Sequence, residues 1–183
     1  MLKNDSLNFV KEVDFIFENS LIKIVALKQL SEIKLVGLKV GPFEEGNEYE
    51  VRFWIAQELS KAGIVRIKEA HLSGVTLYRI QWKERLQPIG EFSTLPQDFY
   101  PRLRRLLEYL KDASKNSPEA MREYEQVQRL FKDILNCRLR KIVSLASKSE
   151  ETKHSRKNLT TEEQWLHEEI GETIRCWIDK IQS

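Results

Sequence analysis

The chain has 183 residues, 41% hydrophobic and 32% charged, a length that suits one large domain or a large domain with a small one. Its 30 basic and 28 acidic side chains leave a net charge of only +2, which argues against a dedicated nucleic-acid coat and suits mixed-charge helices that bind proteins. No apolar run approaches the roughly 20 residues of a membrane span, and two cysteines do not make a disulfide framework, so we expect a reducing compartment.

The first third of the chain predicts a small β-rich unit with one helix laid across it. Short runs of β-branched and aliphatic residues predict strands here, and Gly41-Pro42 ends one of them because proline cannot donate a ladder hydrogen bond. Gly63 stands where a helix would end. In chain order we expect a helix at 6–18, strands at 21–27 and 33–40, an acidic loop at 44–50, a helix at 51–62 and a strand at 64–67.

Residues 69–96 form a connector whose pattern fits two structures. One is a strand around Leu77–Trp82, and the other is a helix with Ser73 as its N-cap. The helix is favoured because four large apolar residues then share one face, and Pro88 and Pro96 mark the loop that follows it. The residues of that face are Val75, Tyr78, Trp82 and Leu86.

The remaining sequence predicts a helical bundle. Ser117-Pro118 supplies an N-cap and a first helical residue for a long helix, whose apolar stripe from Met121 to Leu145 implies a helix of about 30 residues, or about 45 Å. Such a stripe exceeds what one small core needs, so we expect part of it to contact another chain. We expect a helix at 99–110, the long helix at 118–145, an exposed basic loop at 148–158, and a final helix opened by a capping box of Thr160 and Glu163.

Together these elements predict an α+β fold that is mainly α. A small N-terminal β-rich domain with a crossing helix (1–68) is followed by the connector (69–96) and by a C-terminal helical bundle (97–183). We expect Trp54 and Trp177 to face the core, because both fall on the apolar stripes of their helices.

No motif points to a reaction centre. A zinc site would need cysteines and histidines clustered at ligand spacing, and a nucleotide site would need a glycine-rich loop followed by Lys and Ser or Thr. The sequence has neither, so we expect no catalytic residue, metal or cofactor, although a small enzyme whose catalytic residues lie far apart in the sequence remains an alternative. The residues considered are His71, His154, His167, Cys137 and Cys176.

A basic set between Arg138 and Lys157 has two interpretations. It could follow the phosphates of DNA, or it could comprise a solvated helix end and ion pairs. Arg138 and Lys141 lie three residues apart on one helix face, so we expect them to form partly buried ion pairs, within the bundle or across a subunit interface, with carboxylates of the final helix at Glu162, Glu163, Glu168 and Glu169. The nucleic-acid alternative uses Arg140, Lys148, Lys153, Arg156 and Lys157.

A partner interface is expected along the long helix and at the start of the final helix. Aromatic and arginine residues are enriched at the energetic centres of protein interfaces. The candidate interface residues are Tyr124, Val127, Phe131, Arg138, Lys141 and Trp165.

Five short motifs follow one another along the chain. They are Gly41-Pro42-Phe43, Val51-x-x-Trp54-x-Ala56, Leu95-Pro96-x-Asp98-Phe99-Tyr100, Arg138-Leu139-x-Lys141-Ile142 and Leu159-Thr160-x-Glu162-Glu163. In this order they resemble the GINS family of replicative-helicase subunits, in the type that carries the small β domain before the helices. Eukaryotic members have a Pro-Pro-Glu-Trp stretch where this chain has Lys68-Glu69-Ala70-His71, which favours an archaeal subunit.

The resemblance implies a non-enzymatic helicase accessory factor in DNA replication. Its expected role is a scaffold that links the minichromosome maintenance helicase to a RecJ-like protein. The implied partners are a second GINS subunit type in a 2:2 heterotetramer, that helicase, the RecJ-like protein and primase, with weak or indirect DNA contact and no membrane. The implied location is cytoplasmic at the nucleoid, or nuclear in a eukaryotic source. The rival hypothesis is a nucleic-acid-binding adaptor that uses the basic set.

Overall fold

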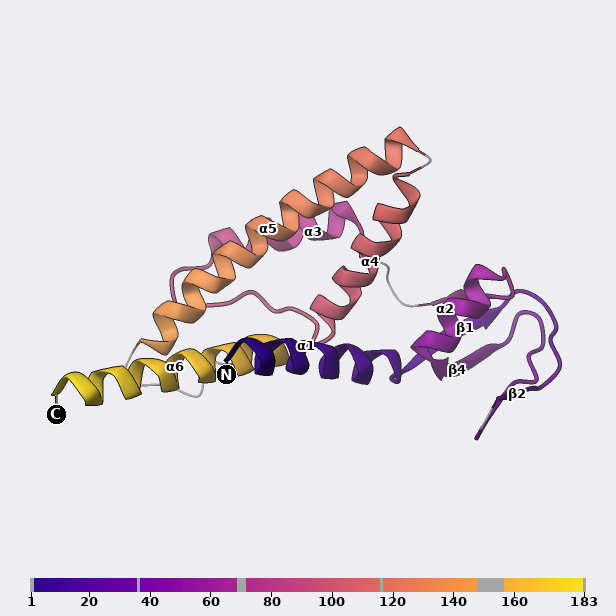
Figure 1. The fold of residues 1–183 in the computed structure, drawn as a ribbon. Coiled ribbons are helices and arrows are strands. Elements are labelled where there is room, and N and C mark those ends of the chain that lie inside the picture. The colour runs from indigo at the N-terminus through magenta and orange to yellow at the C-terminus, as the bar shows by residue number, and fades with distance from the viewer. Residues whose placement is uncertain (1, 36, 69–71, 116, 148–156, 183) are drawn as a thin grey trace. The chain divides into compact units, whose positions relative to one another are not determined.

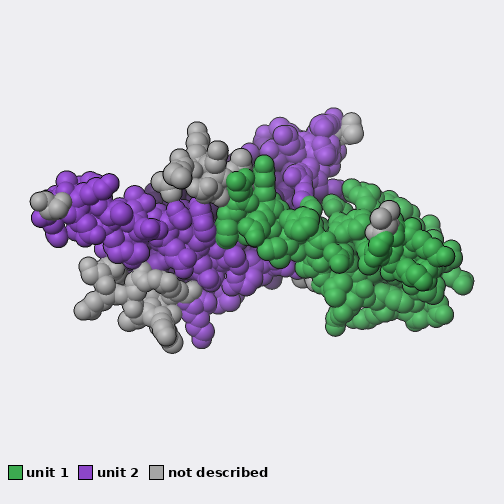
Figure 2. Space-filling model, turned by 60° about the horizontal axis from the view of Figure 1, so that its bottom comes forward, with its two compact units in different colours: residues 1–71 green, residues 72–183 purple. Residues whose placement is uncertain are grey.

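The computed structural model of the chain describes residues 2–35, 37–68, 72–115, 117–147 and 157–182. It contains two compact units, residues 1–71 and residues 72–183, which Figure 2 colours separately. Over the described residues the fold is α+β and mainly helical, as predicted, with the strands confined to the first unit (Figure 1). None of the helices in these ranges combines the length and the apolar character that a membrane crossing requires.

The first unit is built on a three-stranded antiparallel sheet. The central strand β1 (Leu21–Ala26) lies between β4 (Glu48–Arg52) and β5 (Val65–Ile67). Alternate residues of β1 are buried, which gives the sheet one core face, and helix α2 (Phe53–Lys61) packs its buried residues into the same core. Helix α1 (Leu2–Glu18) precedes the sheet, and the ring of Phe17 packs against that of Phe53 at a tilt of 43°, with ring centres 4.5 Å apart.

Two predictions for this unit were wrong. The single strand expected at 33–40 is a hairpin of β2 (Ile33–Leu35) and β3 (Leu38–Val40), because Gly37 adopts a φ of +77° and lets the chain reverse. The loop expected at 44–50 overlaps β4, and Val51 belongs to that strand and not to α2. Exposed glutamates alternate with Tyr49 and Val51 along β4, so its outward face resembles a loop in the sequence.

The second unit is arranged around one long helix. Helix α5 (Pro118–Ala146) contacts α3 (Gly74–Leu86), α4 (Phe99–Ala113) and α6 (Thr161–Gln182), as Figure 1 shows. Gly74 of α3 lies near Gln126, and Gln81 bonds to Asp133. A residue later in α3 therefore contacts a residue later in α5, so these two helices run parallel.

The predicted helix starts are confirmed. Ser117 Oγ accepts a hydrogen bond from the Ala120 amide at 3.3 Å, and Ser73 Oγ accepts one from the Thr76 amide at 3.3 Å. The ambiguous segment 72–87 is therefore a helix over most of its length. Its buried residues are Leu77, Gln81 and Glu84, whereas the large apolar residues Val75, Tyr78, Trp82 and Leu86 are exposed.

Two tryptophans expected in the core lie outside it. Trp177 is 63% exposed and Trp54 is 39% exposed. Helix α5 ends at Ala146, whose carbonyl oxygen lies beside Gly171 of α6, so the residues of α6 beyond Gly171 have no α5 surface to pack against. On α2 the inward side chains are Ile55, Ala56 and Leu59, and Trp54 stands at the edge of that face.

We expect Ser117→Ala to lower the free energy of unfolding by about 1 kcal/mol, because the Ala120 amide loses its acceptor at the start of α5. Chemical denaturation followed by helical circular dichroism measures this change. Ser117→Asp keeps an acceptor at the cap and should stay within about 0.5 kcal/mol of the unchanged chain. An equal loss in both variants would show that the cap bond contributes nothing.

Candidate functional site: a buried charge network

The two cations singled out on α5 lie inside the helical unit. Arg138 is 0% exposed and Lys141 is 6% exposed, although both belong to residue types that are almost never fully buried without a partner. They lie three residues apart on one face of α5, from which Arg138 reaches both α3 and α6 and Lys141 reaches α3. They belong to one connected set of polar groups, which we call the charge network: Glu84, Ser93, Tyr100, Arg138, Lys141, Asn158, Thr160 and Glu163.

The guanidinium of Arg138 uses all five of its N–H donors. Its Nε and Nη2 atoms donate to Glu163 Oε1 and Oε2 at 2.5 and 2.6 Å, which makes a bidentate pair. Its Nη1 atom donates to Glu84 Oε2 at 2.8 Å and to the carbonyl oxygen of Ser93 at 3.1 Å. The second proton of Nη2 goes to the carbonyl oxygen of Asn158 at 2.8 Å. No donor is left without an acceptor, which is the condition for burying a charge.

The carboxylate of Glu84 is the second centre of the network. Lys141 Nζ donates to Glu84 Oε1 and to the Glu84 carbonyl oxygen, each at 2.7 Å. The amide and the hydroxyl of Ser93 donate to Oε2 at 3.0 and 2.6 Å. Glu84 is 0% exposed, so helix α3, the segment after it and helix α5 meet at one dry carboxylate.

Glu163 joins the network to the start of α6. The Thr160 amide donates to Glu163 Oε2 at 3.0 Å, and the Glu163 amide donates to Thr160 Oγ1 at 3.4 Å, so the predicted capping box is present. Tyr100 Oη of α4 donates to Glu163 Oε1 at 2.7 Å. One carboxylate therefore caps α6 and binds side chains from α4 and α5.

Positive and negative charges balance within the network. Two cations and two carboxylates lie within hydrogen-bonding distance, so their buried charges cancel. Burial raises the pKa of Glu84, but the bonds from Lys141 and Ser93 and the charge of Arg138 outweigh burial and hold this pKa below its ordinary value. Burial and the Glu163 carboxylate raise the pKa of Tyr100 well above its ordinary value, so this hydroxyl stays a donor.

The arrangement suits a joint between helices better than a reaction centre. Its donors and acceptors are already bonded to one another, and a substrate would have to displace several short charge-assisted bonds to reach any of them. Within the described ranges no group of three or more His, Cys, Asp and Glu could hold a metal ion. Of the five residues considered for metal, Cys137 is half-buried, Cys176 is exposed, His167 is buried, and His71 and His154 lie outside the described residues.

The other candidate residues are spread over the helical unit. Val127 is 0% exposed and belongs to its core, and Tyr124 and Phe131 are half-buried against the same core. Trp165 is half-buried on α6. Of the nucleic-acid alternative, Arg140 and Lys157 are exposed, and Lys148, Lys153 and Arg156 lie outside the described residues.

Sequence reasoning found Arg138, Lys141 and Glu163 but missed Glu84, so the predicted pairing of Lys141 with the final helix was wrong: Lys141 pairs with Glu84 of α3. A carboxylate seven residues after Leu77 lies on the same helix face, which is the buried one. The apolar residues of α3 instead favoured the other side of the helix, which is exposed. Ser93, Tyr100 and Asn158 were also missed, because main-chain and hydroxyl partners leave no spacing pattern.

Comparisons with known proteins match both units. The family described as PSF2 N-terminal domain matches residues 10–68, and the family described as GINS complex protein helical bundle domain matches residues 70–182. The protein of Homo sapiens named DNA replication complex GINS protein PSF2 is 31% identical over 132 residues, which are 72% of this chain and 67% of the human protein. The Xenopus laevis protein of the same name is 29% identical over 132 residues, with the same shares of the two chains.

We expect Arg138→Ala to lower the free energy of unfolding of the helical unit by about 3–5 kcal/mol, because Glu163 loses its bidentate partner and Glu84 loses one of its two cations. Arg140→Ala removes the same charge from an exposed position two residues away and should change this energy by less than about 0.5 kcal/mol. The free energy of unfolding is measured on both variants by denaturant titration, and their DNA affinity is measured over a range of salt concentrations. Unchanged stability with lost DNA binding in Arg138→Ala would contradict a structural role.

The pH dependence of stability should differ between two carboxylates, Glu84 and Glu162. The lowered pKa of Glu84 means that its contribution is present above the unfolded-state pKa of about 4.3 and is lost as the pH falls through the folded-state value. Glu84→Gln should therefore destabilise the unit by about 3 kcal/mol near neutral pH, and this loss should shrink in acid below about pH 4.

The pKa of Glu162 is shifted in the opposite direction to that of Glu84. Burial raises the pKa of Glu162, which means that the fold disfavours its ionised form above the unfolded-state pKa. Glu162→Gln should raise the unfolding temperature at neutral pH and approach the unchanged chain in acid. Thermal melts of both variants across this pH range test the assignment, and parallel curves would contradict it.

Proposed function

Because the chain belongs to the GINS family, we propose that it acts in DNA replication as the PSF2-type subunit of a GINS complex and catalyses no reaction of its own. The two matched families lie in the order of the two units, which supports this subunit type. As a replication factor it would work at the nucleoid, or in the nucleus of a eukaryotic cell.

The charge network is the observation that carries a non-enzymatic role. It occupies the position where helices α3, α4, α5 and α6 converge, and its groups are bonded to one another within the chain. A network with satisfied donors rigidifies a bundle and specifies one arrangement of its helices. We infer that its purpose is to hold a helical frame in one shape, which is what a subunit of an assembly needs.

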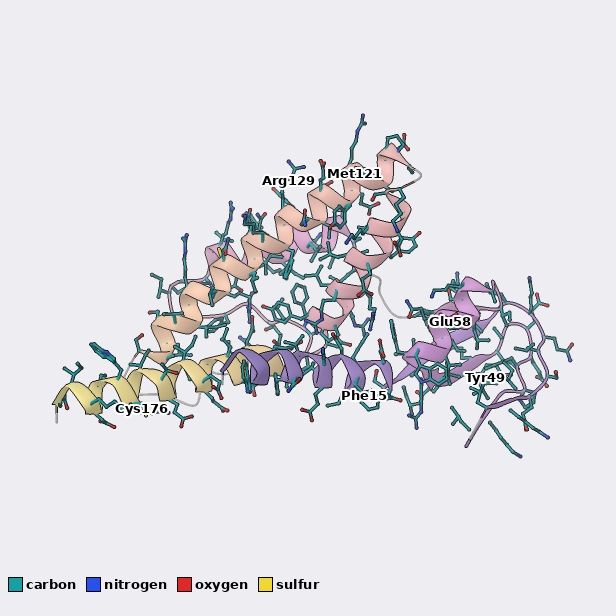
Figure 3. The ribbon with its side chains drawn as sticks, in the orientation of Figure 1. Phe15, Tyr49, Glu58, Met121, Arg129 and Cys176 are labelled. Atoms are coloured by element: carbon teal, nitrogen blue, oxygen red, sulfur yellow. The ribbon has the colours of Figure 1, made fainter. Side chains whose placement is uncertain are left out.

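The outer side of α5 offers surface for an assembly. Its apolar residues divide into a buried set and an exposed set, because the helix is covered on one side only. Leu135, Leu139 and Val143 follow each other at spacings of four residues and are 38%, 39% and 41% exposed. Met121, which Figure 3 labels near the start of the same helix, is 43% exposed. This surface extends the interface proposed at Tyr124, Val127, Phe131, Arg138, Lys141 and Trp165, where Val127, Arg138 and Lys141 would support the interface from beneath.

The partners we propose are a second GINS subunit type in a 2:2 heterotetramer, the minichromosome maintenance helicase and a RecJ-like protein, with primase as a further one. The chain would then link helicase and RecJ-like protein as a scaffold. The alternative is a nucleic-acid-binding adaptor that uses Arg140 and Lys157 together with Lys148, Lys153 and Arg156. Two cations of the original basic set, Arg138 and Lys141, are engaged inside the protein, which favours the scaffold.

We expect the full chain to form a 2:2 complex when it is co-expressed with a GINS subunit of the other domain order, and light scattering on a sizing column measures this. Leu139→Glu with Val143→Glu should weaken assembly at least tenfold, because two carboxylates would have to be buried at the contact. Arg129→Glu makes the same charge change on an exposed part of α5 and should assemble normally. A stable monomer that ignores the second subunit would refute the proposal.

A further inference from the structure

Helix α3 presents an apolar stripe that none of the residues described in its own unit covers. Four large apolar side chains of α3 follow one another at spacings of three and four residues, and Ile89 follows in the turn after the helix, which ends at Leu86; each of the five is more than half exposed. At about 60% exposure the two aromatic side chains alone present on the order of 200 Å² of surface. The members of this α3 stripe are Val75 (64% exposed), Tyr78 (59%), Trp82 (58%), Leu86 (61%) and Ile89 (75%).

The stripe lies opposite the packed side of α3. Residues two positions apart on a helix point about 200° apart, so Trp82 points away from Glu84, which is 0% exposed inside the charge network. Leu77 and Gln81 share the packed side with Glu84. The stripe therefore plays no part in holding α3 against α5, and a side chain can be changed there without disturbing the core.

The flanks of the stripe are cationic. Arg79 and Lys83 border it on one side, and neither makes an ion pair with any residue that the structure describes. Arg85 borders it on the other side and binds Asp133 of α5 at 3.1 Å. The single carboxylate of α3 is Glu84, which is buried and neutralised by Arg138 and Lys141. The exposed side of this helix is apolar along its middle and positively charged along its edges.

The spacing and charge of the α3 stripe favour some binding partners over others. Spacings of three and four residues match the seam between two packed helices, where flanking charges set the choice of partner. A second copy of α3 would bring cations against cations, which is unfavourable. A single-stranded nucleic acid could stack on Tyr78 and Trp82, but it would gain little from the aliphatic Val75, Leu86 and Ile89.

We propose that the α3 stripe is a docking site for an amphipathic helix of another protein, apolar on one face and flanked by aspartate or glutamate. The contact would place the partner's apolar side chains along Tyr78 and Trp82 and its carboxylates beside Arg79 and Lys83. This site is separate from the α5 surface and does not depend on the replication assignment, so each can fail alone.

The test uses the full chain and two synthetic three-heptad helices with the same isoleucine and leucine seam. One peptide carries glutamate at the flanking positions and the other carries lysine. Fluorescence anisotropy of each labelled peptide should show the acidic peptide binding about tenfold more tightly than the basic one. Tyr78→Glu with Trp82→Glu should lose the acidic peptide while the thermal melt stays unchanged.

Charge reversal supplies the decisive control. Arg79→Glu with Lys83→Glu leaves the stripe intact and should invert the preference, so that the lysine peptide binds more tightly. Failure of both peptides, or a preference that charge reversal does not change, would overturn the proposal. So would a dimer in light scattering that Trp82→Glu dissolves, which would indicate a second copy. Displacement of the acidic peptide by an oligothymidine with a steep salt dependence would instead indicate a nucleic-acid site and would also overturn it.

Discussion

A guanidinium taken entirely out of water has to find five acceptors, and the arrangement of the helical unit follows from where Arg138 finds them. Two come from a carboxylate on α6, one from a carboxylate on α3, and two from carbonyl oxygens at Ser93 and Asn158 in the segments between helices. Losing any of these acceptors would leave part of a buried charge without a hydrogen-bond partner, at a cost of several kcal/mol. Few other positions of α3 and α6 against α5 would meet this requirement.

This constraint explains how one helix can serve the interior and the exterior of the unit. The side of α5 that carries Arg138 and Lys141 is held by directional bonds, so its register is set by hydrogen-bond geometry as well as by packing. The opposite side is then free to carry apolar residues that do not determine the fold. The same division recurs on α3, where Glu84 anchors one side and Trp82 occupies the other. On both helices, one side carries the bonds that fix the bundle and the opposite side carries exposed apolar residues.

The sequence predicted the helical half well because periodicity and caps are local signals. Ser117, Thr160 and Glu163 marked helix starts that the structure contains, and the pairing of Arg138 with the final helix followed from their spacing. Periodicity shows that a helix has an apolar face but not which side meets water. That is why the face of α3 gave no warning that Glu84 was the buried residue, and why Trp177 was placed inside. Strand β4 was missed because its exposed glutamates outweigh its two inward residues.

The distances in sequence between the partners of Arg138 set an order of events during synthesis. Glu84 precedes Arg138 by 54 residues, and Glu163 follows it by 25. A ribosome therefore releases α3 and α5 while three of the five acceptors, the Asn158 carbonyl oxygen and both carboxylate oxygens of Glu163, are still inside the exit tunnel or not yet made. Until α6 emerges, closing the bundle would bury a cation with too few partners. We therefore expect the helical bundle to close only after α6 has left the ribosome, because Arg138 has its full set of acceptors only then.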